Sequence, residues 1–70
     1  MKRITHEELN ELPFGSMIRV VWHNSCNHGS TEEYYGVIFG NMIGYEDGKI
    51  DNVRTIAEAA YNNQCLVYLM

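Results

Sequence analysis

Polar and apolar side chains alternate along several short stretches of this chain, which is the pattern of β-strands that bury one face. Turn-forming residues separate these stretches, among them the pairs Gly40-Asn41 and Asp47-Gly48. Trp22 is expected to face the core. We predict five strands, over residues 17–22, 33–39, 42–45, 49–53 and 65–70. The middle three should form a meander, because short turns join antiparallel neighbours.

The strand predicted over 33–39 decides which aromatic side chains are buried. Because successive residues point to opposite faces, Tyr35, Val37 and Phe39 share one side. We expect that side to face the core, which leaves Tyr34 exposed on the other. Gly36, in the middle of the strand, indicates either a bulge or a close approach of another backbone.

A capping box marks the start of the first predicted helix. Thr5 and Glu8 have the S/T-x-x-E spacing, in which each side chain bonds the backbone N–H of the other residue. Ile4 and Leu9 flank this box at the positions of a hydrophobic staple. We expect the helix over residues 6–12, ended by the proline that follows, because a residue before proline avoids the helical region.

A second box, formed by Thr55 and Glu58, predicts one or two helical turns over residues 56–61. Asn62 and Asn63 then provide a C-terminal stop, since asparagine tolerates the left-handed backbone conformation. The apolar run that comes next should pair inside the sheet rather than fray at the end of the chain.

Length and composition indicate a single folded domain. Seventy residues allow one thin core, and residues 1–70 contain no linker, repeat or low-complexity tract. The hydrophobic fraction of 46% and the charged fraction of 20% are typical of globular proteins. We predict a mainly β (α+β) fold, with an N-terminal helix within residues 5–12 and a small five-stranded barrel over 14–70. Closing the barrel would hide the edges of the short strands.

This layout resembles the small β-barrels of the Src-homology-3 type. The resemblance rests on the run GSMIRV at 15–20, the long polar loop over 23–31, and YGVI at 35–38 as the next strand. A helical turn over 55–61, just before the last strand, completes it. The resemblance implies the architecture and no binding residues, because the Ala-Leu-Tyr-Asp-Tyr signature of the peptide-binding members is absent. Small accessory proteins of phages and prophages have a similar size and layout, although a shared fold does not determine function.

Targeting signals and a disulfide scaffold are not expected. No apolar run follows Lys2 and Arg3, which excludes a signal peptide by pattern. The longest apolar stretches are far shorter than the ~20 residues that a membrane span needs. Two cysteines, Cys26 and Cys65, are too few for the disulfide framework of a small secreted domain. The sequence therefore predicts a cytoplasmic protein with no membrane partner.

The polar loop contains three residues with metal or nucleophile chemistry, His23, Cys26 and His28. Together with Cys65 they could offer two nitrogen and two sulfur ligands to Zn²⁺, so a metal-stabilised domain is one alternative. Their spacing matches no standard ligand pair, and we expect incidental histidines in a solvated loop and no cofactor. The histidines could instead activate Cys26 as a nucleophile. We expect no enzyme, because so short a chain leaves little room for a pocket of about 300 Å³.

Charge and exposed aromatic residues predict the kind of partner. A net charge of −4, with only five scattered basic residues, argues against nucleic acid and suits a larger, basic protein. Tyr34 and Tyr45 are candidate interface anchors. Four acidic residues have no evident capping or turn role: Glu32, Glu33, Glu46 and Asp51.

We therefore predict a non-enzymatic protein-binding module that uses these six side chains, such as an accessory or inhibitor protein of a phage or other mobile element. A self-associating structural protein is a further alternative. It would be a homodimer that pairs through its sheet edges, because a thin core gains stability from a dimer interface.

Overall fold

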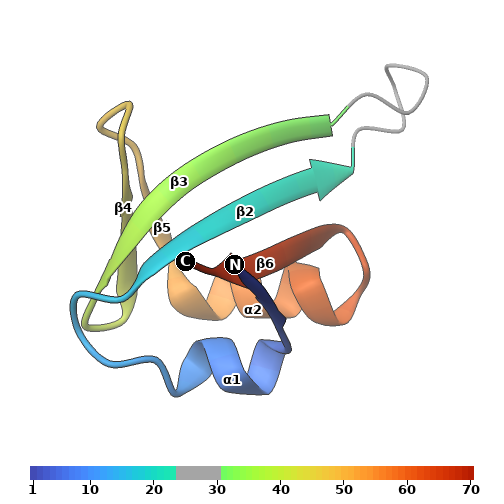
Figure 1. Ribbon diagram of the computed structural model, residues 1–70, viewed down its shortest axis with the longest axis horizontal. Coiled ribbons are helices and arrows are strands. Elements are labelled where there is room, and N and C mark those ends of the chain that lie inside the picture. Colours follow the sequence, from blue (N-terminus) through green and yellow to red (C-terminus); the bar gives the residue numbers. More distant parts are fainter. Residues whose placement is uncertain (24–30) are drawn as a thin grey trace.

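The computed structural model describes residues 1–23 and 31–70, which form one antiparallel sheet with two helices packed on one of its faces (Figure 1). The strands are β1 (Lys2–Ile4), β2 (Met17–His23), β3 (Thr31–Phe39), β4 (Met42–Tyr45), β5 (Ile50–Asn52) and β6 (Cys65–Leu69). The helices are α1 (His6–Asn10) and α2 (Val53–Tyr61). No helix in this described part of the chain has the length and apolar character needed to cross a membrane.

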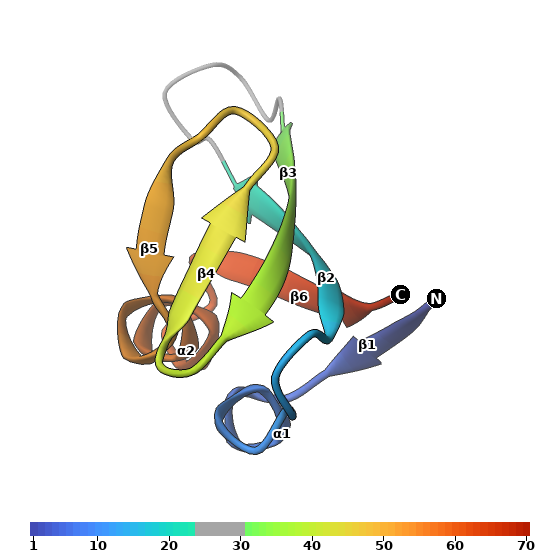
Figure 2. The same ribbon diagram turned by 90° about the vertical axis from the view of Figure 1, so that its left-hand side faces the viewer.

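The order of strands across the sheet is β1-β6-β2-β3-β4-β5, which makes β1 and β5 the edges (Figure 2). The prediction of a mainly β fold is confirmed. The closed five-stranded barrel is not confirmed, since the described residues form six strands in one open sheet. The extra strand, β1, was missed because three residues with a single apolar side chain show no alternation.

The helices define an inner, covered face of the sheet, whereas neither of the two helices in the described residues lies on the outer face. The core lies between the sheet and the helices. Its buried members are Ile4, Leu9, Ile18, Val20, Ile38, Ile43, Val53, Ile56, Ala57, Ala59, Cys65 and Val67. The last strand, β6, lies between β1 and β2 in the sheet, as the apolar run predicted.

The predicted orientation of β3 is wrong. Ile38 is buried opposite Ile43, whereas Tyr35 and Val37 are 37% and 40% exposed on the outer face. Tyr34 shares the inner face with Ile38 and is partly buried. Alternation alone allows either face to be inward, and the register with β2 decides it, because Tyr34 pairs with the fully buried Val20.

Gly36 fulfils the prediction of a close approach, and the pairing on both of its sides shows a regular register rather than a bulge. A Cβ atom at this position would lie 2.6 Å from Cγ2 of Ile43 and 3.2 Å from the carbonyl oxygen of Gly44. Because real Cβ atoms do not come so close to other heavy atoms, only glycine fits here without movement of the neighbouring strand.

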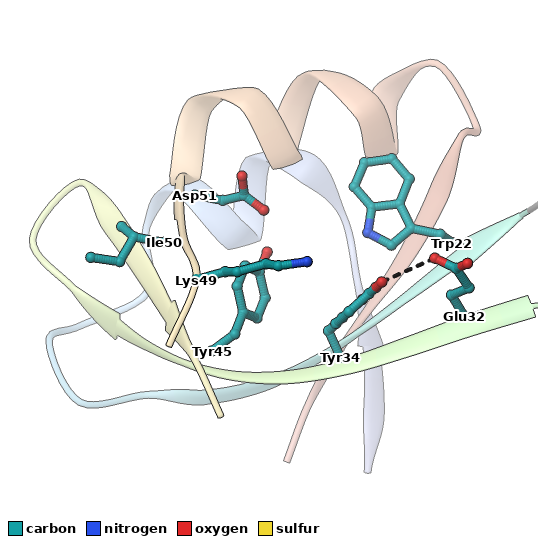
Figure 3. A pocket seen from close by; sticks show the side chains of 7 residues that line it. All are labelled: Trp22, Glu32, Tyr34, Tyr45, Lys49, Ile50 and Asp51. Atoms are coloured by element: carbon teal, nitrogen blue, oxygen red, sulfur yellow. Dashed lines mark hydrogen bonds between the residues drawn. The ribbon is translucent and has the colours of Figure 1, made fainter. Parts of the chain in front are cut away.

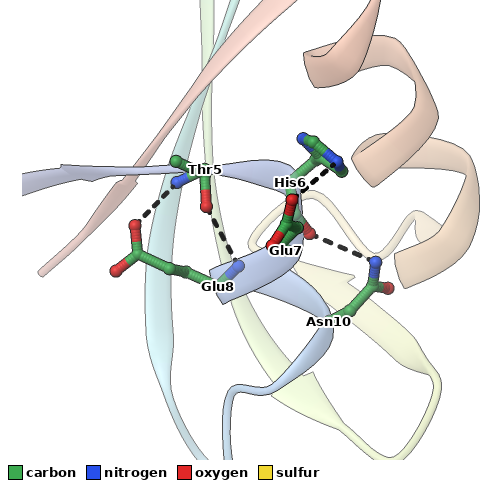
Figure 4. Close-up of polar contacts among 5 residues, drawn as sticks. All are labelled: Thr5, His6, Glu7, Glu8 and Asn10. Atoms are coloured by element: carbon green, nitrogen blue, oxygen red, sulfur yellow. Dashed lines mark hydrogen bonds and ion pairs between the residues drawn. The ribbon is translucent and has the colours of Figure 1, made fainter.

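The capping box of α1 is confirmed (Figure 4). The Glu8 N–H donates to Oγ1 of Thr5 at 3.2 Å, and the Thr5 N–H donates to Oε1 of Glu8 at 3.1 Å. The helix ends at Asn10, before the predicted boundary at residue 12. It packs against α2, where the rings of His6 and Tyr61 meet edge to face with centroids 5.0 Å apart.

The second predicted capping box is wrong, because α2 begins earlier. Asn52 is the N-cap, and its Oδ1 accepts a hydrogen bond of 2.9 Å from the Arg54 N–H, which leaves Thr55 inside the helix. Starting at Val53 places the apolar residues of α2 on the face that covers the sheet. The predicted stop is confirmed, since Asn63 has a φ of +59°.

Candidate functional site: an acidic aromatic hollow

The inner face of the sheet changes character along the β2–β3 hairpin. Ile18 and Val20 are fully buried beneath the helices, but Trp22, the next inner residue of β2, is only partly buried. On β3 the inner side chains pass from Ile38 to the partly buried Tyr34. The aliphatic core is therefore continued by aromatic and polar side chains towards the distal end of the hairpin.

An open hollow of about 480 Å³ lies over this part of the sheet (Figure 3). We call it the acidic aromatic hollow, after its lining of Trp22, Glu32, Tyr34, Tyr45, Lys49, Ile50 and Asp51. These residues come from β2, β3, β4, β5 and the turn before β5. Four neighbouring strands thus each contribute a wall.

Two tyrosine rings form one corner of the hollow. The rings of Tyr34 and Tyr45 have centroids 5.8 Å apart and planes tilted by 59°. The Tyr34 hydroxyl donates a hydrogen bond of 3.0 Å to Oε2 of Glu32, which is two residues away on the same side of β3. This bond fixes the orientation of a carboxylate beside an aromatic ring.

A tight turn after β4 places Lys49 beside the rings. The Tyr45 N–H donates to the Lys49 carbonyl oxygen at 2.9 Å, and the Lys49 N–H donates to Oδ1 of Asp47 at 2.9 Å. Gly48, with a φ of +87°, allows the chain to reverse between them. Lys49 lines the same hollow as the two tyrosines, and its side chain crosses Tyr45 in the view of Figure 3.

The charges in the hollow are carboxylates and one ammonium group, because both tyrosines stay neutral near pH 7. The hydrogen bond to Glu32 and the charge of its carboxylate raise the pKa of Tyr34. Burial, followed by the nearby Asp51 carboxylate, raises the pKa of Tyr45. Although Asp51 is close enough to act on this pKa, the buried Tyr45 hydroxyl has no hydrogen-bond partner in the described residues. Two carboxylates and one lysine therefore share the hollow with three aromatic side chains.

The structure brings together four of the six side chains proposed as a binding surface, namely Glu32, Tyr34, Tyr45 and Asp51. The other two, Glu33 and Glu46, do not line this hollow, but they line a smaller neighbouring hollow of about 250 Å³ together with Tyr34 and Tyr45. Glu33 also forms an ion pair with Arg19, and Glu46 is exposed just after β4. The six predicted residues thus line two neighbouring hollows that share the two tyrosines.

Sequence reasoning missed the contributions of Trp22, Lys49 and Ile50 to this site. Trp22 was assigned to the core because it continues the apolar face of its strand, and it does pack against the core, but it is only partly buried and also lines the hollow. The sequence did contain a signal that Trp22 is only partly covered. The segment after it is polar, so few apolar side chains remain to bury an indole at the end of the strand. Lys49 and Ile50 gave no signal, because only the turn geometry brings them into the lining of the hollow.

The residues considered for metal binding or nucleophilic catalysis are only partly placed. Cys26 and His28 lie outside the described residues. His23 is exposed at the end of β2 on the outer face, whereas Cys65, which pairs with Trp22, faces inward, so these two side chains do not converge. Among residues 1–23 and 31–70, no cluster of three His, Cys, Asp or Glu residues is placed to hold a metal ion.

Cys65 is a core residue. It is 1% exposed, and its thiol lies 3.8 Å from the Ile56 carbonyl oxygen. Burial raises the pKa of the thiol to about 11, which keeps it protonated and unreactive at neutral pH.

A second hollow, of about 510 Å³, lies between α1, the β3–β4 turn and the start of α2. Its polar lining consists mainly of amide side chains, Asn10, Asn41 and Asn52, with Arg54. It has neither an aromatic ring nor a carboxylate. The acidic aromatic hollow is the better candidate, because it combines large contact surfaces with charge.

The lining of the acidic aromatic hollow suits non-covalent binding. Aromatic faces and carboxylates attract positively charged groups, and tyrosine and tryptophan supply contact area. Comparison with protein-family models, with curated proteins and with solved structures finds no match for this chain. A function is therefore inferred from the chemistry of the hollow itself.

Proposed function

We propose that this protein is a non-enzymatic binding module that engages a larger, basic protein through the acidic aromatic hollow. The observation that carries the proposal is the convergence of three aromatic side chains, Trp22, Tyr34 and Tyr45, with the carboxylates of Glu32 and Asp51. Aromatic residues of this kind are the usual anchors of protein interfaces. Carboxylates around them add complementarity to a basic surface.

The hollow is largely preorganised, which supports a binding role. Its walls stand on paired strands, and the hydrogen bond from Tyr34 already holds Glu32 in place. Side chains that are ordered before binding lose less entropy when the partner arrives. The net charge of −4 would also speed the approach of a basic partner over longer distances.

The setting we propose is that of an accessory or inhibitor protein of a phage or other mobile element, acting in the cytoplasm. The resemblance in size and layout to such proteins supports it. The binding role requires the curved sheet and its hollow, and it does not require a closed barrel of the Src-homology-3 type.

The test is capture of proteins from a bacterial extract on the immobilised protein. The diagnostic variant is Glu32→Gln with Asp51→Asn, which removes two charges but keeps groups able to accept hydrogen bonds. Its matched control is Glu11→Gln with Glu58→Gln, two exposed positions outside the hollow. Glu33 is unsuitable for this test because its carboxylate is engaged by Arg19.

We expect the wild type and the control to capture the same basic protein. The hollow variant should capture about tenfold less of it, because it lacks two charges that face the basic partner. Circular dichroism should show that all three proteins are folded. Equal capture by the hollow variant and the control would contradict the proposal.

A further inference from the structure

We infer that the acidic aromatic hollow receives one cationic side chain, a lysine or an arginine of the partner, and that Lys49, which lines the hollow in the free protein, competes with it. The inference rests on the proposed function, because it names the group that the hollow would recognise. It follows from the arrangement of the rings, from the carboxylates beside them and from the position of Lys49.

The aromatic walls have the geometry that attracts a cation. A positive group within about 6 Å of a ring centroid is drawn to the negative face of the ring. Tyr34 and Tyr45 are too close together to hold a group between parallel faces, but their 59° tilt forms a corner against which one group can rest. Trp22, from β2, provides a further wall, and its indole has the largest ring face of the three (Figure 3).

The carboxylates complete a site for a positive group. Glu32 stands on the Trp22 side of the hollow and Asp51 on the opposite side (Figure 3). An ammonium or guanidinium between them could donate hydrogen bonds to carboxylate oxygens while its alkyl chain lies against the rings. An anionic group would meet the same two carboxylates and be repelled.

Lys49 is the one cationic side chain that lines the hollow among the described residues. It is 77% exposed, and its Nζ is 3.9 Å from Oδ2 of Asp47. Ion pairs this exposed are weak, so a partner cation can displace the lysine at little cost. Replacing Lys49 therefore shows the charge of the group that binds. The replacement should strengthen the binding of a cation and weaken the binding of an anion.

The probes are the blocked peptides acetyl-Gly-Arg-Gly amide and acetyl-Gly-Lys-Gly amide, with citrulline in place of arginine as the uncharged control. Trp22 is the only tryptophan in the chain, so its fluorescence reports directly on the hollow. Amide shifts in NMR spectra locate the binding residues independently. The variants are Lys49→Gln, the pair Glu32→Gln with Asp51→Asn, and Glu11→Gln as the control.

We expect the two cationic peptides to bind with a dissociation constant on the order of 1 mM, as suits a single anchoring side chain. The citrulline peptide should bind about tenfold more weakly. Lys49→Gln should tighten binding by about three- to tenfold, the double carboxylate variant should weaken it by about tenfold, and Glu11→Gln should leave it unchanged.

The inference is overturned if the arginine and citrulline peptides bind alike, if neither perturbs Trp22, or if Lys49→Gln weakens binding. These results are distinct from failure of the proposed function. If a captured protein depends on the hollow but arginine peptides do not compete with it, the binding module stands and the cationic anchor is wrong. If the peptides bind but no captured protein depends on the hollow, the proposed function fails.

Discussion

The guanidinium carbon of Arg19 lies 5.7 Å from the centroid of the Tyr68 ring, on the outer face of the sheet. The two residues are directly opposite each other on β2 and β6. The same guanidinium forms an ion pair with Glu33, and its Nε is buried without a hydrogen-bond partner in the described residues. Glu33 therefore has a structural role in balancing a side chain that is only 23% exposed.

Replacing Glu33 with Gln should destabilise the fold by about 1 kcal/mol, because it leaves the Arg19 charge without its partner in a partly desolvated position. Urea unfolding followed by Trp22 fluorescence measures this. The same change at the exposed Glu46 is the control and should stay within about 0.5 kcal/mol. Equal effects at both positions would show that the ion pair contributes nothing.

The start of α2 can be tested with two alanine substitutions. Asn52→Ala removes the side chain that accepts the Arg54 N–H, and it should cost about 1 kcal/mol of unfolding free energy. Thr55→Ala lies within the helix and should be neutral or stabilising by up to about 0.5 kcal/mol, since alanine is the better helix former. A larger loss of unfolding free energy in Thr55→Ala than in Asn52→Ala would instead support the capping box predicted from the sequence.

Gly36 and Gly44 form a matched pair for testing close packing in the sheet. An added methyl at Gly36 meets the fully buried Ile43 and the Gly44 backbone, so Gly36→Ala should cost about 1–3 kcal/mol. At Gly44 the new methyl would lie 2.8 Å from the ring of Phe39, which is partly exposed on the outer face and able to rotate away. Thermal unfolding should therefore show a smaller loss of stability for Gly44→Ala than for Gly36→Ala. The reverse order would contradict the register described for these strands.

Stability should depend on pH through Tyr45. Burial raises the pKa of its hydroxyl above its ordinary value of about 10, so the unfolded chain loses this proton before the folded protein does. The stabilising contribution is complete below pH 10 and is lost as the pH rises further. We expect the free energy of unfolding to fall more steeply above pH 10 in the wild type than in Tyr45→Phe. Urea titrations at a series of pH values measure the two slopes, with Tyr61→Phe, at an exposed position, as the control; identical slopes for all three proteins would refute this role of Tyr45.

Thiol labelling separates the two cysteines. Because Cys65 is buried and its pKa is raised to about 11, iodoacetamide should modify it only after unfolding, as read by site-resolved mass spectrometry. Rapid labelling of Cys65 in the folded protein would contradict its place in the core. The same experiment tests the nucleophile hypothesis for Cys26, which requires fast modification near neutral pH and is removed by ordinary, slow labelling.

Local signals in the sequence predicted much of the fold. The capping box at Thr5 depends on residues three positions apart, and the turns at Gly40 and Gly48 depend on glycines that adopt φ values of +63° and +87°. Such features are encoded by near neighbours, and alternation likewise located five of the strands. The predicted start of α2 was wrong. Asn52 and Thr55 are both good N-cap residues, and the burial of Val53 decides in favour of Asn52.

Two features could not be predicted from local sequence signals: which face of β3 points inward, and the assembly of the acidic aromatic hollow. Alternation states that Tyr34 and Tyr35 point apart, but the choice of the inner residue depends on which β2 residues they pair with. The hollow combines side chains from four strands, and their proximity is set by sheet pairing rather than by spacing in the chain. Four of its residues were nevertheless named in advance, because acidic and aromatic side chains without a local role tend to be available for binding.

The position of β6 has a consequence for how the protein is made. This strand comes last in the chain order of the described elements, yet it separates β1 from β2 in the finished sheet. A nascent chain on the ribosome can form the β2–β5 meander early, but β1 has no strand to pair with until residues 65–69 have left the exit tunnel. Pairing of β1 with the sheet is therefore completed only after synthesis of this segment, whereas α1 already has α2 to pack against.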